Sequence, residues 1–171
     1  LTAPMDYTPG AMHNATRQDY HPIDDNPMSQ GTRVHQMAMY TVFDAPLQML
    51  SDKPSLYERF PECTDFISKV PTVFDDCRTL QGEMGEYIVT AKRKGATWFV
   101  GAMTSWKERE LELKLDFLDN ATYKAVIFCD GVNASRNAED YKLEEKTVKK
   151  GDVLKITMKS GGGWTARFEK M

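Results

Sequence analysis

The apolar residues of this 171-residue chain change their spacing once, near Thr79. Before that point they recur three and four positions apart, as on the buried side of an α-helix, and after it they alternate, as in a strand with one buried face. The segment RELELKLDF, residues 109–117, shows the alternation most clearly, because charged residues separate its leucines. Two periods in one chain predict two architectures in succession, which we assign to residues 1–77 and 78–171.

The second part predicts an all-β antiparallel sandwich. Short alternating runs, about seven in number, are separated by turn signals such as Lys94-Gly95 and Gly151-Asp152. The runs on either side of Gly151 are predicted to form a hairpin. The residues expected to point into the space between the two sheets are Trp98, Leu111, Leu113, Leu115 and Phe168.

The first part predicts two strands and two helices in alternation. Residues 1–5 and 46–50 (PLQML) are short apolar runs of the kind that form buried strands. A long polar loop follows the first run, and Asn26-Pro27 then has the form of a helix start, with Asn as the cap and Pro at the first helical position. The apolar stripe of that helix is Val34, Met37, Ala38, Thr41 and Val42.

A second helix is predicted from Ser55, which with Glu58 has the spacing of a capping box. Pro61 kinks or restarts this helix, which ends near Lys69. Strands that alternate with helices indicate a parallel sheet. Two such units cannot bury their own apolar faces. We therefore interpret residues 1–77 as an α/β remnant, the last two β/α units of a (β/α)8 barrel of about 250 residues, followed by the sandwich.

Six blocks of the sequence resemble the C-terminal region of glycoside hydrolase family 97, which includes α-glucosidases and α-galactosidases of Bacteroidetes. The blocks are PMDYTPGAM, MSQGTRVHQMAMYTVFDAPLQMLSD, VPTVFDD, GEMGEYIVTAKRKGATWFVGAMTSW, AEDYK and GGGWTARF. Together they run nearly end to end. The resemblance implies that the opening stretch is the seventh barrel strand and PLQML the eighth, and that the parent enzyme also has an N-terminal β-sandwich.

The chemistry of that family uses carboxylates at the barrel mouth and a calcium ion. Inverting members use glutamates as acid and base, and retaining members use an aspartate nucleophile. The resemblance places these carboxylates and the calcium ligands upstream of Leu1, so it implies no catalytic residue, metal ligand or cofactor within this chain. The choices between glucosidase and galactosidase, and between retention and inversion, stay open.

The resemblance further implies that the parent hydrolyses terminal α-linked glucose or galactose of oligo- or polysaccharides, in the periplasm or cell envelope. We recognise no targeting signal in this segment, and we expect the segment alone to be inactive. The sandwich then supports the barrel. Its alternative role is a carbohydrate-binding module that uses exposed aromatic residues.

Three residues are candidate contacts to the substrate. Asp6 and Tyr7 come at the end of the presumed barrel strand, where barrel enzymes place their sites, and could hydrogen-bond sugar hydroxyls. The alternative is an Asp that ties down its own Thr-Pro-Gly loop. Trp106 lies in a polar turn and is the tryptophan expected to be exposed, whereas Trp98 and Trp164 are expected in the core.

Other polar residues are interpreted as structural. Asp19, His21, Asp24 and Asp25 share one loop but lack metal-ligand spacing, so a solvated rim is expected, and His35 is expected to be a packing histidine. Glycoside hydrolysis needs two carboxyls about 5–10 Å apart across one sugar. The acidic pairs that do not fall at a barrel strand end are assigned to the surface: Asp75-Asp76, Glu83 and Glu86, Glu108 and Glu110, and Glu139-Asp140.

Composition limits the partners. The net charge is −3 with interspersed signs, so no nucleic acid is expected, and no apolar run is long enough to span a membrane. Cys63, Cys77 and Cys129 form no C-x-x-C pair and are expected to be core thiols. The helix that carries Val34 and Met37 has lost the sheet it would cover. We expect it to pack on the sandwich or on a partner chain, so self-association through the remnant is one option.

Overall fold

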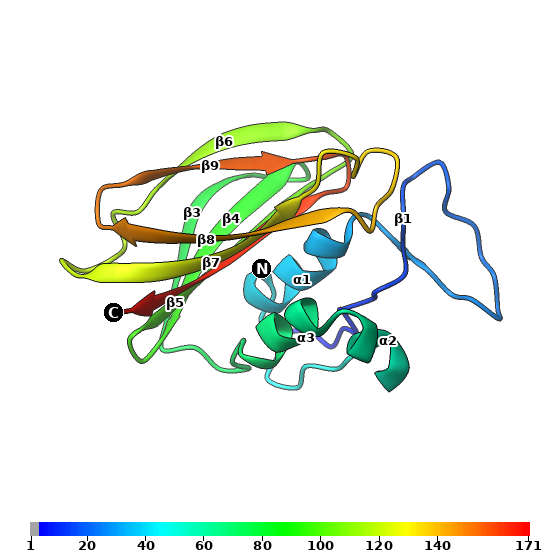
Figure 1. Cartoon of the computed structure of the whole chain (residues 1–171), viewed down its shortest axis with the longest axis horizontal. Coiled ribbons are helices and arrows are strands. Elements are labelled where there is room, and N and C mark those ends of the chain that lie inside the picture. Colours follow the sequence, from blue (N-terminus) through cyan, green and yellow to red (C-terminus); the bar gives the residue numbers. More distant parts are fainter. Residues whose placement is uncertain (1–3) are drawn as a thin grey trace.

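The computed structural model describes residues 4–171 of the chain. A six-stranded antiparallel sheet forms the centre of the molecule, with a two-stranded sheet against one face and three helices against the other (Figure 1). The β-sandwich therefore confirms the predicted architecture of the second part. No helix within residues 4–171 is both long and apolar enough to cross a membrane.

The large sheet has the strand order β3-β4-β5-β10-β7-β8, and β6 pairs with β9 in the small sheet. All pairs in both sheets are antiparallel. The strands are β3 (Asp76–Glu83), β4 (Tyr87–Lys94), β5 (Thr97–Thr104), β6 (Arg109–Lys114), β7 (Thr122–Asp130), β8 (Tyr141–Lys149), β9 (Val153–Met158) and β10 (Gly163–Lys170). The last strand in sequence thus lies between β5 and β7.

The space between the sheets holds the larger of two apolar cores. Leu113, Leu115 and Phe168 are fully buried and Trp98 nearly so, while Glu112 on the same strand as Leu113 is exposed. The predicted register of the alternating strands is therefore confirmed, since a shift by one residue would have exchanged the two faces.

The predicted hairpin around Gly151 is wrong in one respect. The turn is present, and Gly151 has a φ of 86° that suits glycine. The strands on either side of it, however, belong to different sheets, because β8 pairs with β7 and β9 pairs with β6. The chain crosses from one layer to the other at this turn, and local turn chemistry does not distinguish such an arch from a hairpin.

Helix α1 (Arg33–Val42) begins later than predicted from Asn26-Pro27. Thr32 is the actual cap, and its side-chain oxygen accepts a hydrogen bond from the His35 backbone N–H at 3.1 Å. Residues 16–28 instead form a loop whose ends are held by two short parallel strands, β1 (Asn14–Ala15) and β2 (Ser29–Gln30). The predicted stripe is buried throughout.

The second predicted helix is two helices, α2 (Pro54–Arg59) and α3 (Pro61–Ser68). The break at Pro61 was predicted, because proline lacks the N–H that would continue the first helix. The capping box was wrong. Ser55 lies inside α2, and Lys53 takes the cap position without a side-chain bond.

The two strands predicted in the first part are absent from the residues described. Residues 1–3 lie outside these residues, and neither residues 4–5 nor 46–50 form a strand. The two segments still run side by side in the same direction, with the Met5 N–H bonded to the Asp44 carbonyl at 3.0 Å and the Ser51 N–H bonded to the Pro9 carbonyl at 3.1 Å. Two such bonds do not form the regular hydrogen-bond ladder of a parallel sheet. Parallel strands occur almost only in larger sheets whose two faces are both covered, and these two segments lack such a sheet.

Helix α1 lies on β5 and β10, as expected for a helix that packs on the sandwich. Met37 and Val42 are 1% and 3% exposed, so this face is covered within the chain. The close approach requires glycine below the helix. A Cβ on Gly101 would lie 2.9 Å from Val42, and a Cβ on Gly163 would lie 2.6 Å from the His35 backbone.

The cysteine prediction holds for one residue and fails for another. Cys63, a residue of α3, is buried, Cys129 is partly buried, and Cys77 is exposed. Cys77 belongs to β3, which is an edge strand of the large sheet, and edge strands leave one side in solvent.

Candidate functional site at the junction of helix and sheet

The three candidate substrate contacts are not brought into one pocket. Tyr7 lies at the C-terminal end of α1, where it contacts Phe43, and Asp6 beside it is exposed. Trp106 lies at the other end of α1, against Gly161 in the β9–β10 turn. A helix of ten residues is about 15 Å long, so these positions cannot contact the same sugar ring.

Tyr7 faces α1. Its hydroxyl donates a hydrogen bond to the Met39 carbonyl at 3.1 Å, and its ring meets Phe43 edge-on at 5.1 Å. Burial, reinforced by the nearby Asp44 carboxylate, raises the pKa of Tyr7 to about 12, so the hydroxyl stays a neutral donor. Tyr7 thus fixes the opening segment to the helix.

Trp106 is partly buried and engaged on its ring. A Cβ on Gly161 would lie 2.5 Å from the ring, and the Arg17 guanidinium lies over the ring at 5.6 Å from its centre. The Ser160 hydroxyl donates to the Trp106 carbonyl at 2.7 Å. These contacts join the β1–β2 loop to the sandwich and favour a packing role over a free stacking platform.

The most unusual polar group of the junction is Asp130, at the end of β7. Its carboxylate accepts from the Thr32 hydroxyl at 2.6 Å, from the Lys159 N–H at 2.8 Å and from the Gly163 N–H at 3.1 Å. Burial raises the pKa of Asp130 to about 7, although these three hydrogen bonds act in the opposite direction. One carboxyl therefore joins the cap of α1 to the turn between β9 and β10.

His35 extends the same junction from the first turn of α1. Its Nδ1 lies 3.0 Å from the Gly162 carbonyl and donates a hydrogen bond to it. Burial lowers the pKa of His35. The prediction of a packing histidine with a satisfied partner is confirmed.

Arg33 clamps the loop segment to the sandwich. This buried guanidinium donates to the Met12 carbonyl at 2.5 Å, pairs with Glu139 at 3.0 Å and lies 3.8 Å from the centre of the Phe60 ring. Because removing one partner of a buried ion pair typically costs 3–5 kcal/mol, a role in stability accounts for this arrangement.

Lys92 makes the equivalent connection at the other end of α1. The side chain is 1% exposed, and its ammonium group donates to the Phe43 carbonyl at 3.0 Å and to Asp44 at 2.5 Å. Lys92, a residue of the sheet, thereby donates a hydrogen bond to a carbonyl at the end of α1 that has no partner within the helix.

The acidic pairs assigned to the surface have local partners. Asp75 accepts from Lys94 and Gly95, and Glu86 pairs with Arg109. Glu108 pairs with Lys159 across the β6 side of the sandwich, with a hydrogen bond from Ser135 that lowers the pKa of Glu108. Carboxylates with fixed partners of this kind stabilise the fold and do not face each other across a sugar-sized space.

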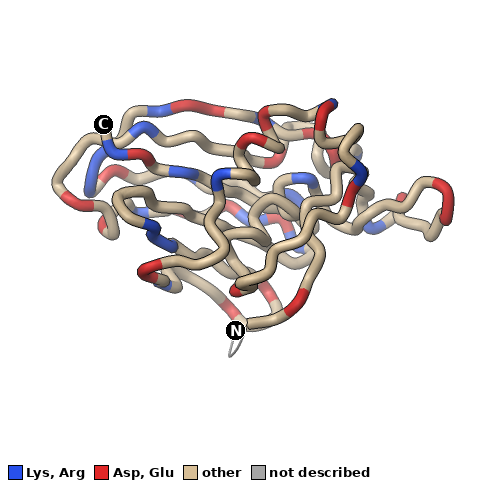
Figure 2. The backbone as a smooth tube through the Cα atoms, turned by 90° about the horizontal axis from the view of Figure 1, so that it is seen from below, with Lys and Arg blue, Asp and Glu red and all other residues tan. Residues whose placement is uncertain are grey.

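The β1–β2 loop projects from the molecule, and its tip is acidic (Figure 2). Asp19, His21, Asp24 and Asp25 are exposed on it, as expected for a solvated rim. No group of three or more His, Cys, Asp or Glu side chains within residues 4–171 is placed to hold a metal ion. Positive and negative residues are interspersed over the rest of the chain (Figure 2).

Apart from His35, the residues of the junction were not predicted from the sequence, although signals for two of them exist. Thr32 stands three positions before His35, the spacing of an N-cap. Asp130 stands at the end of the apolar run in TYKAVIFCDG and is followed by Gly131, a pair typical of a turn. The burial of Arg33 and Lys92 had no local signal, because charged residues on a helix or strand are normally exposed.

An antiparallel sandwich joined to a helical segment through buried polar groups and glycines defines an accessory β-sandwich module. The sequence profile described as "Glycosyl-hydrolase 97 C-terminal, oligomerisation" matches residues 73–169. The chain therefore belongs to glycoside hydrolase family 97 as its C-terminal region, and the resemblance found in the sequence is confirmed.

Two curated relatives match this chain over nearly its whole length. A retaining α-galactosidase of Bacteroides thetaiotaomicron is 49% identical over 169 residues, which is 99% of this chain and 26% of the relative. A probable retaining α-galactosidase of Streptomyces bingchenggensis is 25% identical over 162 residues, which is 95% of this chain and 23% of the relative.

Among solved structures, a glycoside hydrolase family 97 enzyme from Pseudoalteromonas sp. strain K8, in complex with panose, superposes with a TM-score of 0.89 at 33% identity. The match covers 99% of this chain and 27% of that enzyme. The chain thus spans about a quarter of the length of these relatives.

Proposed function

We propose that this chain is the C-terminal part of a longer retaining α-galactosidase, in which the sandwich supports the last two units of a catalytic barrel. The observation that carries the proposal is the 49% identity, over 99% of the chain, to a protein named a retaining α-galactosidase. The activity, substrate and anomeric outcome belong to the longer protein.

The geometry of the first part supports a barrel remnant over residues 1–77. The segments around Met5 and Asp44 run in the same direction, as the last two parallel strands of a barrel would. Helix α1 packs on β5 and β10 of the sandwich, and its C-terminal end contacts these segments, so α1 occupies the layer that barrel helices occupy (Figure 1). We propose that residues 78–171, the sandwich, form the second domain of this region.

Asp6 is the proposed substrate contact. The Tyr7 hydroxyl is bonded to α1, whereas the neighbouring Asp6 is exposed, and the proposal assigns Asp6 to the mouth of the completed barrel. Trp106 is not carried forward as a sugar platform, because Arg17 and Gly161 engage its ring.

Calcium, implied by the resemblance, would be held by the longer protein. The residues described here contain no ligand cluster that fits it, so no step involving this chain is assigned to the ion. A periplasmic or cell-envelope location is proposed on the same resemblance. Fractionation of cells that express the longer protein, followed by immunoblotting, tests the location.

The second candidate is an α-glucosidase. The structure from Pseudoalteromonas sp. strain K8 was determined with panose, and its identity of 33% is lower than that of the galactosidase relative. The longer protein is assayed with p-nitrophenyl α-galactoside and α-glucoside, and NMR of the first product identifies its anomer. Preference for the galactoside with release of the α-anomer supports the proposal, and preference for the glucoside replaces it by the second candidate.

The purified 171-residue chain is expected to hydrolyse neither substrate, with or without calcium. The reaction needs two carboxyls across the scissile bond, and loss of either typically lowers the rate by orders of magnitude. Turnover by the chain that disappears in Asp6→Ala would move the chemistry into this segment and overturn its supporting role.

A further inference from the structure

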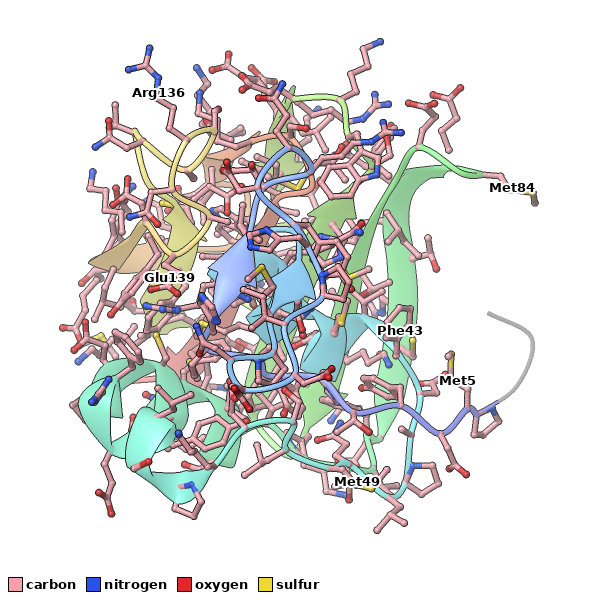
Figure 3. All side chains as sticks on the ribbon, turned by 90° about the vertical axis from the view of Figure 1, so that its right-hand side faces the viewer. Met5, Phe43, Met49, Met84, Arg136 and Glu139 are labelled. Atoms are coloured by element: carbon pink, nitrogen blue, oxygen red, sulfur yellow. The ribbon has the colours of Figure 1, made fainter. Side chains whose placement is uncertain are left out.

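An apolar groove runs along one flank of α1. Val42 and Phe43 form one wall, Ile88 and Met103 line the floor, and the β3–β4 hairpin closes the end, with Met84 fully exposed at its tip. The groove has a volume of about 510 Å³. Figure 3 labels Phe43 and Met84, two of the residues that line it.

Two helices cover most of the helix-bearing face of the large sheet. Helix α3 lies over β7 and β8, with Phe66 against Phe128 and Glu62 bonded to Tyr141, and α1 lies over β5 and β10. The groove lies over β3, β4 and the adjoining end of β5, which carries Met103, and α1 also contacts β4. Two strand spacings are about 9.6 Å, which is within the usual distance of about 8–10 Å between packed helices. The next position in the series therefore has room for one helix.

Across the sheet from β8 toward β3, the helices that cover it come earlier and earlier in the sequence. Helix α3 follows α1 in sequence, so the position on the other flank of α1 belongs to the helix that precedes α1 in the outer ring of a barrel. The opening segment agrees with this order. It reaches the groove side of the molecule, where Tyr7 contacts Phe43 and the Met5 N–H bonds Asp44.

We propose that the groove over β3 and β4 is the seat of the barrel helix that comes before residue 1 in the longer protein. This inference rests on the proposed function and adds to it a third contact between barrel and sandwich. The length of the relatives supports this occupant, because about three-quarters of each lies outside the region matched here. The helix presents an apolar stripe to Ile88 and Met103, since the floor offers these two side chains.

Methionine oxidation reports whether a helix covers the groove, because the rate of sulfoxide formation depends on the exposure of the sulfur atom. The 171-residue chain and the longer protein are treated with hydrogen peroxide and analysed by peptide mass spectrometry. Met103 is the reporter, buried Met12 is the protected reference and exposed Met171 is the reactive reference. Oxidation of Met103 in the chain at a rate between the references, and at the Met12 rate in the longer protein, supports the proposal.

Two outcomes overturn it. Equal oxidation of Met103 in both proteins shows that no helix covers the groove. Protection that disappears on dilution shows that a second copy of the chain is the occupant. The readout does not involve activity, so a longer protein that lacks galactosidase activity but protects Met103 at all concentrations refutes the proposed function and leaves the helix seat in place.

A matched pair of variants provides a second measurement. Met103→Lys places a charge in the groove, and Val153→Lys places one at a half-exposed position on β9. The melting temperature of the longer protein is expected to fall with Met103→Lys and not with Val153→Lys, and the 171-residue chain tolerates both. Equal tolerance of Met103→Lys in both proteins contradicts the proposal.

Discussion

A single buried carboxyl, Asp130, connects three parts of the chain, and its protonation is coupled to folding. The pKa is about 7 in the folded state and about 4 in an unfolded chain. Between these values the folded state holds a proton that the unfolded state has released. The contribution to stability is therefore full below about pH 4 and is lost as the pH rises to about 7, with a slope of at most about 1.4 kcal/mol per unit.

His35 titrates in the same junction with the opposite sign. Its pKa is lowered by burial, so stability from the neutral ring is lost as the pH falls. The comparison with Asp130→Asn separates the two groups. Urea unfolding at several pH values is expected to show that the stability of the parent chain relative to Asp130→Asn decreases from pH 4 to 7. A difference that does not change with pH would show that Asp130 titrates at its ordinary value.

The cap of α1 supplies the next prediction at this scale. Thr32→Val removes a hydroxyl that accepts from His35 and donates to Asp130, with little change in shape. Loss of an N-cap costs about 0.5–2 kcal/mol, and a buried acceptor without its donor costs about 1–3 kcal/mol. We expect a loss of about 2–3 kcal/mol in the free energy of unfolding. Thr32→Ser, the control, should be close to the parent chain, and equal losses would point to the lost methyl group instead.

Little of the junction could be predicted from the sequence, for a physical reason. Asp130 and Thr32 are 98 positions apart, and neither shows locally that the other will lie at 2.6 Å. The prediction of Asp6 and Tyr7 as substrate contacts depended on an assumed barrel strand, and that of Trp106 on its position in a polar turn. Trp98 and Trp164 were predicted correctly because a position in an alternating strand is a local property.

Among the elements, α1 packs closely on the sheet because the residues directly below it, Gly101 and Gly163, have no side chain. Gly163→Ala would place a methyl group 2.6 Å from the His35 backbone, a contact that only movement of the helix can relieve. Such crowding typically costs about 1–3 kcal/mol. Hydrogen exchange of the α1 amides should become faster in this variant.

Gly85 in the β3–β4 turn serves as the control for that variant. It has a φ of 79° and nothing within 4 Å of a Cβ, so Gly85→Ala introduces only backbone strain, about 1 kcal/mol. Protection of α1 is expected to be unchanged in this control. Faster exchange of α1 in both variants would indicate a general loss of stability rather than displacement of the helix.

The elements that could be predicted are those with a period of their own. The sandwich strands and the stripe of α1 follow from alternation and from helical spacing. The start of α1 was misplaced because Asn26-Pro27 carries a stronger local signal than Thr32. The strand at residues 46–50 was predicted from apolar composition, but a strand also needs hydrogen-bond partners on its edges, which composition does not report.

At the scale of the whole molecule, the two predicted domains share a core. Val34, Met37 and Tyr40 of α1 cluster with Phe99 of β5 and Phe128 of β7. We therefore expect the 171-residue chain to unfold in one transition. Native-state hydrogen exchange should give the same opening free energy for α1 and for β10. A markedly lower value for α1 would show that residues 1–77 and 78–171 open as separate units.

The position of β10 has a consequence for synthesis at the ribosome. Strands β5 and β7 both require β10 as their neighbour, so each keeps an open edge until residues 163–170 have been made. Once residues 122–149 have been made, the nascent chain carries two incomplete half-sheets, β3-β4-β5 and β7-β8, until β10 follows, and open edges invite pairing with other chains. Emergence of residues 163–170 from the ribosome joins the two half-sheets and completes the surface on which α1 packs. Folding of the domain therefore depends on the strand that is made last.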